Sequence, residues 1–198
     1  MKKIFLFDLG NVLSKPLDDL VLYNKLNCKI PYDEFLKYWW GNDLVLKAHM
    51  GLVTDDEHVE ALLKFCESDL SIKQFYEVYN SLDNSLYDDT IEIINDLKNK
   101  GYKVGLLSNL RLMDYKRYKQ QIEKINFDYI FLSYEMKCIK PSKDIYKQVI
   151  DRLKCEADEI IFFDDNEKNV NGAKLLGINA YQVTGENIKD LFYKVIDI

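Results

Sequence analysis

Four short runs of almost unbroken apolar residues constrain the fold of this chain more than any other feature of its sequence. A strand with one exposed face alternates apolar and polar residues, whereas a strand buried on both faces of a parallel sheet is apolar throughout. Charged or turn residues bound each run, as they bound typical short strands. The sequence therefore predicts buried parallel strands at KIFLFD (3–8), KVGLLSN (103–109), YIFLS (129–133) and EIIFFDD (159–165).

Helical patterns separate the later apolar runs. Residues 88–101, DDTIEIINDLKNKG, place apolar residues at helical spacing, open with acids and close with Lys100-Gly101, a typical helix stop. Residues 141–153 begin with Pro and Ser, which suit a helix N-terminus, and residues 169–178 contain another glycine stop. This alternation predicts an α/β fold with a doubly wound parallel sheet.

Residues 14–87 interrupt the alternation. They contain several amphipathic segments in succession and no convincing buried strand, and Thr54 with Glu57 three residues later is a capping-box helix start. The block is too long for a simple crossover between strands, which would not need about five helices. We therefore expect a helical insertion after the first strand, with the α/β domain formed by residues 1–13 and 88–198.

Charge and cysteine content narrow the classes of function. A net charge of −6 over 198 residues gives no general attraction to nucleic acid or to an anionic membrane, since both need a basic surface. No stretch approaches the roughly 20 apolar residues of a membrane helix. The four cysteines are scattered without CxxC spacing, and His49, His58 and Cys66 lack compact metal-ligand spacing. We expect a soluble, cytoplasmic protein with reduced thiols and no nucleic-acid or membrane partner.

Side chains that can bind ligands or take part in a reaction stand at the ends of three predicted strands, at Asp8, Ser108-Asn109 and Asp164-Asp165. In an open α/β sheet, ligands bind at the carboxyl ends of the strands, so these residues should converge. Lys140, at the start of a predicted helix, adds a positive charge. Carboxylates hold Mg²⁺ through oxygen, while a lysine and a hydroxyl hold phosphate oxygens. The set predicts a site for a divalent cation and a phosphoryl group.

Four motifs in this order resemble those of the haloacid dehalogenase-like (HAD) phosphohydrolases. Their residues are Asp8 in FDLGNVL, Ser108 in GLLSN, Lys140 in IKPSKDIY and Asp164-Asp165 in IIFFDDNEKNVNGAKLLGI. The helical block 14–87 resembles the cap that this superfamily inserts after its first motif. The DLGNV variant and the stretch HMGLVTDDEHVEAL are similar to the bacterial sugar-phosphatase branch. The resemblance covers essentially the whole chain and implies a Rossmann-type core with a small helical cap.

The resemblance implies a nucleophile and a set of metal ligands. Asp8 would attack phosphorus and form an aspartyl-phosphate, which splits one difficult displacement into two easier ones. Mg²⁺ would be bound by Asp8, by the backbone carbonyl of Gly10 and by Asp165. Asp164 would be a ligand directly or through water.

The resemblance also implies how the transferring group is held. The Ser108 hydroxyl, the Asn109 backbone N–H and the Lys140 ammonium would contact the phosphoryl oxygens. The implied function is Mg²⁺-dependent hydrolysis of phosphomonoesters. Because a closing cap admits only small molecules, we expect a small phosphorylated metabolite, and a sugar phosphate is favoured.

Gly10 stands where most phosphatases of this superfamily carry a second aspartate, which protonates the leaving alcohol. Glycine cannot move a proton, and a positioned acid–base typically contributes ~10²–10⁴-fold. Three alternatives stay open: a good leaving group such as an anomeric sugar 1-phosphate, a substitute acid, or a phosphate-binding module with little or no catalysis. The candidate substitutes are Asp18, Asp19 and His49, although Asp18 in PLDDL also suits a helix N-cap.

Two other activities of the superfamily fit less well. Its dehalogenases carry a bulky aromatic residue where Gly10 stands and need no metal, whereas this chain retains the acidic pair. A phosphomutase needs the acid–base that Gly10 lacks. Neither activity is therefore favoured over phosphomonoester hydrolysis.

Aromatic and basic residues offer further candidates for substrate contacts. Tyr38, Trp39 and Trp40 would suit a wall against a sugar face, but three consecutive helix residues cannot all face one way. Packing within the helical block is therefore favoured for this cluster. Arg111, just beyond Ser108-Asn109, either reaches a substrate or begins a helix, and the sequence does not decide between the two.

Overall fold

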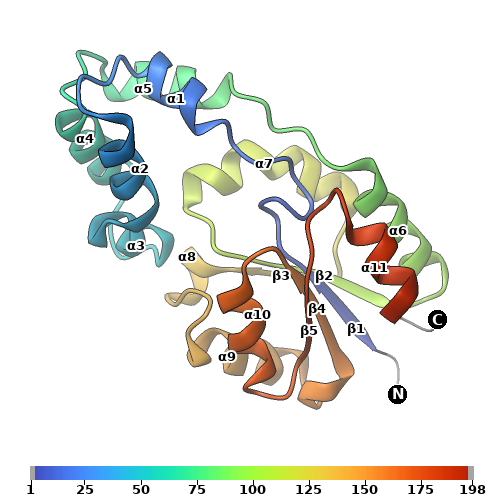
Figure 1. Cartoon of the computed structure of the whole chain (residues 1–198). Coiled ribbons are helices and arrows are strands. Elements are labelled where there is room, and N and C mark those ends of the chain that lie inside the picture. The colour runs from blue at the N-terminus through green and yellow to red at the C-terminus, as the bar shows by residue number, and fades with distance from the viewer. Residues whose placement is uncertain (1–2, 196–198) are drawn as a thin grey trace.

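The computed structural model describes residues 3–195, in which a five-stranded parallel sheet is flanked by helices on both faces (Figure 1). The strand order is β3-β2-β1-β4-β5. The predicted α/β class with a doubly wound parallel sheet is therefore confirmed. Residues 1–2 and 196–198 of the predicted α/β domain lie outside the described residues. The strands are β1 (Ile4–Phe7), β2 (Lys103–Ser108), β3 (Tyr129–Leu132), β4 (Ile160–Asp164) and β5 (Asn179–Gln182).

Strand β5 is an element of the sheet that the apolar pattern does not reveal. Its sequence, NAYQ, is not an apolar run. Ala180 is buried, whereas Asn179 and Gln182 are exposed. Because β5 lies at the edge of the sheet and pairs only with β4 among the strands described, part of it faces solvent and needs no apolar side chains.

Side chains of β1 enter two separate hydrophobic cores, one on each face of the sheet. Phe5 and Phe7 belong to one core, and Ile4 and Leu6 belong to the other. The first core is covered by α6 (Asp88–Asn99), α7 (Leu112–Ile125) and α11 (Ile188–Val195). The second core is covered by α8 (Ser133–Met136), α9 (Lys143–Leu153) and α10 (Glu167–Lys174) (Figure 1). The 3₁₀ helix η1 (Ala157–Glu159) precedes β4.

No helix in the described part of the chain has the length and apolarity that crossing a membrane requires.

Five helices lie between β1 and α6, and we call them the helical group; four of them contribute side chains to a third hydrophobic core. The Asp18 side chain accepts a hydrogen bond from Val21 N, and the Thr54–Glu57 capping box is formed, as their sequences indicated. The group lies beyond the carboxyl ends of the strands (Figure 1). Its members are α1 (Asp19–Lys25), α2 (Tyr32–Gly41), α3 (Asp43–His49), α4 (Asp55–Phe65) and α5 (Ile72–Asn80).

The helical group is attached to the α/β core on two sides. On one side, Arg117 of α7 donates from Nη2 to the carbonyl of Leu82 at 3.1 Å, next to the linker that returns to the core. On the other, Lys137, which follows α8, donates from Nζ to the carbonyl of Gly51 at 2.7 Å. The group is therefore held at both ends as well as by its two linkers.

Candidate active site

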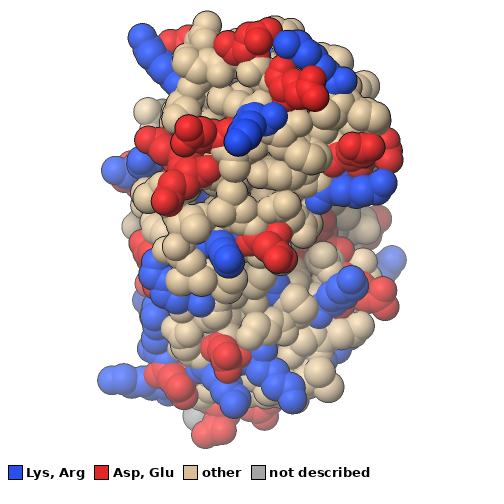
Figure 2. All heavy atoms as spheres, turned by 90° about the vertical axis from the view of Figure 1, so that its left-hand side faces the viewer, with Lys and Arg blue, Asp and Glu red and all other residues tan. Residues whose placement is uncertain are grey.

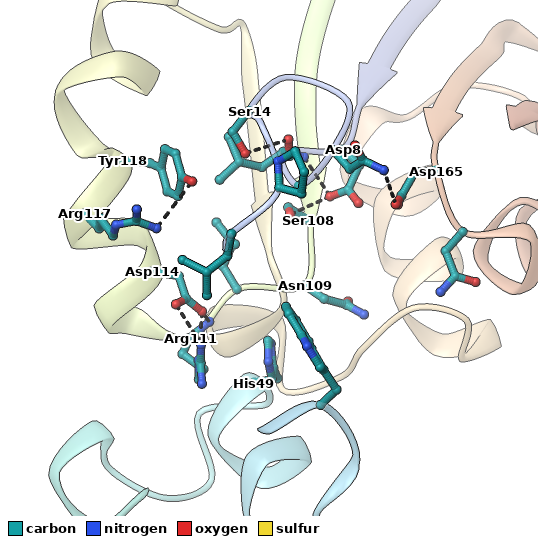
Figure 3. Close-up of a pocket in the computed structure, with 18 of the residues that line it drawn as sticks. Asp8, Ser14, His49, Ser108, Asn109, Arg111, Asp114, Arg117, Tyr118 and Asp165 are labelled. Atoms are coloured by element: carbon teal, nitrogen blue, oxygen red, sulfur yellow. Dashed lines mark hydrogen bonds and ion pairs between the residues drawn. The ribbon is translucent and has the colours of Figure 1, made fainter. Parts of the chain in front are cut away.

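The candidate site lies at the carboxyl ends of the strands, where the strand order reverses between β1 and β4. From β1 the chain proceeds outward to β2 and β3, whereas β4 and β5 lie on the other side, and open α/β sheets bind ligands at such a point. Asp8 follows β1, Ser108 ends β2 and Asp164 ends β4. The parallel register of these three strands brings the three side chains together. Asp8 and Ser108 are seen side by side in Figure 3.

Asp8 is held by one oxygen and leaves the other unbonded. Its Oδ1 accepts hydrogen bonds from the Ser108 hydroxyl at 2.5 Å and from Leu9 N at 2.7 Å, and lies 3.0 Å from Lys140 Nζ. Oδ2 has no hydrogen-bond partner among residues 3–195. Burial raises the pKa of Asp8 to about 6, although Lys140 and Ser108 oppose the shift. The carboxylate is thus fixed in orientation, with one oxygen free.

Lys140 is a fully enclosed cation shared by two carboxylates. Its Nζ lies 2.6 Å from Asp164 Oδ2 and 3.0 Å from Asp8 Oδ1, and it donates to the carbonyl of Leu107 at 2.9 Å. Burial disfavours its charge, but the two carboxylates raise the pKa of Lys140 above its ordinary value. The lysine therefore carries a permanent positive charge beside Asp8.

The Asn109 side chain positions Lys140. Its Nδ2 donates to the Lys140 carbonyl at 3.0 Å, and its Oδ1 accepts from the Lys140 amide at 2.8 Å. Two hydrogen bonds thus join the loop after β2 to the loop before α9. This amide clamp was not anticipated from the sequence, where only the Asn109 backbone N–H was given a role.

Three carboxylates form a cluster that suits a metal ion. Asp8, Asp164 and Asp165 each offer an oxygen, and these oxygens lie within 4.8 Å of one another. Among residues 3–195 this is the one such cluster of potential ligands, so His49 and Cys66 are not brought together as a metal site. Hard oxygen donors of this kind are the ligands that Mg²⁺ prefers, and the residues present fit that ion.

The two neighbouring acids of the fourth motif differ in how many hydrogen bonds they accept. Asp164 Oδ2 contacts Lys140, and its Oδ1 accepts from Asn166 N at 2.9 Å and from Asn169 Nδ2 at 3.0 Å. Asp165 Oδ2 accepts one side-chain hydrogen bond, from Asn11 Nδ2 at 3.1 Å, and burial raises the pKa of Asp165. Asp165 therefore has more capacity left for a cation than Asp164.

Asn11 and Asn169 are site residues that the sequence reasoning missed. Asn11 adopts a left-handed backbone conformation with φ 56°, a conformation that asparagine tolerates better than most residues, so the turn residues of DLGNV could have indicated it. Asn169 lies in the first turn of α10, five residues after Asp164, and its spacing alone gives no signal. Each asparagine orients one acid of the cluster.

Gly10 leaves space where a second carboxylate could stand. It lines the cavity beside Asp8, and a Cβ built on it would have no heavy atom within 4 Å. Nothing in the described structure therefore fills the position by packing. The residue lacks an acid, but its surroundings could accommodate one.

Arg111 precedes α7 and is bound to protein groups on every side, in what we call the Arg111 network. Its Nε and Nη2 donate to the two oxygens of Asp114 at 2.9 and 3.0 Å, its Nη1 donates to His58 Nε2 at 3.0 Å, and its Cζ lies 4.3 Å from the Trp39 ring. The Tyr79 hydroxyl donates to Asp114 Oδ1 at 2.6 Å. Although burial opposes its charge, Arg111 holds the pKa of Asp114 well below its usual range. Arg111 therefore joins the core to the helical group.

The three candidate substitutes for the missing acid occupy different places. Asp18 caps α1 and does not line the cavity that contains Asp8, whereas Asp19 and His49 do. Burial, together with the positive charge of Arg111, lowers the pKa of His49 to about 4, so its ring is neutral at pH 7. The His49 Nδ1 has no hydrogen-bond partner among residues 3–195.

A cavity of about 480 Å³ lies between the core and the helical group and contains the site. Its lining joins the carboxyl ends of the strands to α7, with Asp8, Ser108 and Asp165 on one side of the view and Arg117 on the other (Figure 3). Outside, the face shown in Figure 2 carries acidic and basic side chains interspersed with uncharged ones. The volume is within the range of small-molecule sites.

Comparison with known proteins identifies relatives of the chain. A family model described as haloacid dehalogenase-like hydrolase matches residues 36–183. A HAD family enzyme from Bacteroides thetaiotaomicron, solved in complex with magnesium and inorganic phosphate, is 29% identical with a TM-score of 0.82, over 97% of this chain and 100% of that one.

Two curated relatives match over shorter spans. The (S)-2-haloacid dehalogenase 4A of Burkholderia cepacia is 27% identical over 153 residues, 75% of this chain and 65% of the relative. The rat bifunctional epoxide hydrolase 2 is 31% identical over 87 residues, 41% of this chain and 16% of the relative. The chain therefore spans less than two thirds of either relative's length.

Proposed function

Because this chain belongs to the haloacid dehalogenase-like hydrolase family, we propose that it is a Mg²⁺-dependent phosphomonoester hydrolase with Asp8 as its nucleophile. The observation that carries the proposal is the state of Asp8: three donors fix Oδ1, and Oδ2 is left unbonded beside a cavity. Because most buried polar side-chain atoms have a hydrogen-bond partner, an unbonded carboxylate oxygen beside a cavity favours a role in binding or chemistry. The magnesium and phosphate bound by the Bacteroides enzyme support the same reading.

The residues around Asp8 would divide the work of the first step. Asp8 Oδ2 would attack phosphorus as the ester P–O bond breaks, giving an aspartyl-phosphate and an alcohol whose oxygen takes its proton from solvent. The Ser108 hydroxyl, the Asn109 N–H and the Lys140 ammonium would hold the phosphoryl oxygens. Lys140 also favours the ionised form of Asp8 and so opposes the rise in pKa that burial causes. Water would then attack the phosphorus of this intermediate, releasing inorganic phosphate and regenerating the Asp8 carboxylate.

The acidic cluster would hold Mg²⁺ through Asp8, Asp165 and the Gly10 carbonyl. Asp164 would act through water, because its oxygens already accept hydrogen bonds or contact Lys140. Bound there, Mg²⁺ would offset the negative charge of the phosphoryl group. The chain's own acids would supply the hard oxygen ligands that the ion needs.

The substrate we propose is a small sugar phosphate, as in the bacterial sugar-phosphatase branch. Residues 14–87 would form the cap, with residues 1–13 and 88–198 as the catalytic core, so that the substrate is enclosed in the cavity between them. Since Gly10 supplies no proton, a good leaving group such as that of a sugar 1-phosphate is favoured.

The cysteines present are free thiols, which supports a cytoplasmic location.

Phosphate release from a panel of phosphomonoesters tests the proposal. The panel runs from an aryl phosphate through sugar 1-phosphates to sugar 6-phosphates, with Mg²⁺ or EDTA. Asp8→Asn should lower turnover by at least ~10³-fold, while Asp33→Asn, at an exposed acid of α2, should leave it unchanged. A folded wild-type protein that binds phosphate but turns over nothing would instead support the alternative, a phosphate-binding module, which the missing acid at Gly10 favours.

A further inference from the structure

Three consecutive aromatic residues of α2 occupy three different environments. Tyr38 stacks on Phe65 within the helical group, with ring centroids 4.3 Å apart, and Trp39 is 1% exposed in its core. Trp40 is 54% exposed and lines the cavity that contains Asp8. Of the cluster, then, Trp40 is the member that a ligand in the cavity can reach.

The Trp40 ring is held in place although it is exposed. Its Nε1 donates to Asp19 Oδ2 at 2.9 Å, which joins α2 to the start of α1. Its ring packs against Trp39 in a near-perpendicular contact, with centroids 6.2 Å apart and an interplanar angle of 71°. Trp39 in turn lies under the Arg111 guanidinium. An exposed indole fixed by two contacts loses little conformational entropy when a ligand stacks on it.

The cavity lining near the helical group combines apolar and polar side chains. Pro16, Leu17 and Leu46 line it together with Trp40, and Asp19 and His49 add polar groups. A sugar ring presents an apolar C–H face and hydroxyl groups around it, so it can satisfy both kinds of lining. A purely aromatic leaving group would match only the apolar part.

We propose that Trp40 is the platform on which the apolar face of a sugar leaving group stacks, and that Asp19 is the positioning residue that holds the indole. This inference rests on the proposed function, since it concerns the leaving group of the same phosphomonoester. Asp8 and its neighbours engage the phosphoryl end, and Trp40 engages the ring. Substrate selection therefore depends on the helical group, while the chemistry depends on the core.

Paired substrates separate ring recognition from chemistry. Glucose 1-phosphate and p-nitrophenyl phosphate carry rings, whereas acetyl phosphate carries none. Trp40→Ala should raise KM for glucose 1-phosphate about fivefold to tenfold with little change in kcat, as expected for one lost stacking contact. Constants for acetyl phosphate should not change. Trp40→Phe should restore most of the affinity, and Asp19→Ala should show a smaller rise in KM.

The control is Leu52→Ala, because Leu52 is similarly exposed at 57%, lies in the turn between α3 and α4 and does not line the cavity. It should leave all three substrates unchanged. An equal change for acetyl phosphate and glucose 1-phosphate, or no change for either, would overturn the inference. An effect confined to p-nitrophenyl phosphate would overturn the assignment to a sugar.

A binding measurement keeps the inference independent of turnover. The chain has two tryptophans, one buried and one exposed, so glucose 1-phosphate should change the fluorescence of wild type but not of Trp40→Phe. Inorganic phosphate alone should change neither. If wild type hydrolyses nothing, the proposed function fails, and this titration still decides the stacking: a response retained in Trp40→Phe, or absent from wild type, contradicts it.

Discussion

Two buried cations, Lys140 in the core and Arg111 beside the helical group, are almost equally enclosed, with exposures of 2% and 3%. Both contact carboxylates, but the carboxylates differ. Both oxygens of Asp114 accept hydrogen bonds, from Arg111 and from Tyr79, whereas Asp8 keeps one oxygen unbonded beside the cavity. A buried ion pair alone therefore says little about function, and an unused ligand atom facing a cavity says much more.

Lys140→Met should have the largest effect, because it removes the charge that balances Asp8 and Asp164. Breaking a buried pair typically costs about 3–5 kcal/mol of stability. Losing a donor to the phosphoryl group typically costs about 10²–10³-fold in turnover. Urea unfolding in EDTA and phosphate release in Mg²⁺ measure the two effects. A variant with wild-type turnover would show that Lys140 takes no part in the chemistry.

Arg111→Met should cost a similar 3–5 kcal/mol of stability, because Asp114 is left buried without its cation. Turnover per folded molecule should stay within about threefold, since the guanidinium is bound to protein groups and not to the reacting atoms. Urea unfolding measures the free energy of unfolding, and phosphate release at 15 °C, divided by the folded fraction, measures turnover per folded molecule. A hundredfold fall in kcat with the fold intact would place Arg111 in the active site and remove the contrast with Lys140.

Gly10→Asp should raise turnover of sugar 6-phosphates by ~10²-fold, the lower end of a positioned acid–base contribution. The gain is expected because a Cβ at this position has no neighbouring heavy atom within 4 Å, so an added side chain has room to begin. Gly10→Asn is the matched control, since it has the same size but no proton to transfer. Equal rates for the two variants would mean that the missing proton transfer is not what limits the enzyme.

The smallest predicted effect is on the pH dependence of stability. Burial and the charge of Arg111 lower the pKa of His58 to about 3, against an ordinary value near 6.5. Between these values the unfolded chain binds a proton that the folded chain does not, so stability is lost as pH falls below about 6.5. His58 alone should contribute about 2 kcal/mol to the loss at pH 5, in addition to the contribution of His49, whose pKa is also lowered.

His58→Gln provides the control for this pH dependence, because its amide oxygen can still accept from Arg111 but does not titrate. The free energy of unfolding of wild type and variant, measured between pH 7.5 and 5, should diverge in slope. Identical slopes would contradict the neutral state of His58 in the folded protein.

The core was more predictable from the sequence than the surroundings of the helical group, for a physical reason. Asp8, Ser108 and Asp164 end strands of one parallel sheet, and the sheet alone brings strand ends to a common edge. The contacts of Arg111 with His58 and Trp39 join separate helices, and no local pattern encodes such packing. Strand β5 was missed because an edge strand need not be apolar.

The aromatic cluster shows the same limit at the scale of single residues. Helical periodicity correctly implied that Tyr38, Trp39 and Trp40 point in different directions. It could not say which of them faces a cavity, because that depends on where α2 lies against α1 and the core. The Asn109 clamp on Lys140 was likewise hidden, since it links loops 31 residues apart.

The helical group is attached at both ends, through Arg117 and Lys137, and this attachment affects how substrate and product reach and leave the cavity. Any movement of the group away from the sheet would have to break the bonds of Arg117 to Leu82 and of Lys137 to Gly51. With the group in this position, solvent reaches the cavity beside its exposed lining residues, which are Gly10, Lys15, Pro16, Trp40 and Asn166. The incoming phosphate ester and the outgoing phosphate would pass through the same opening. Phosphate that is still bound would therefore slow the binding of the next substrate molecule.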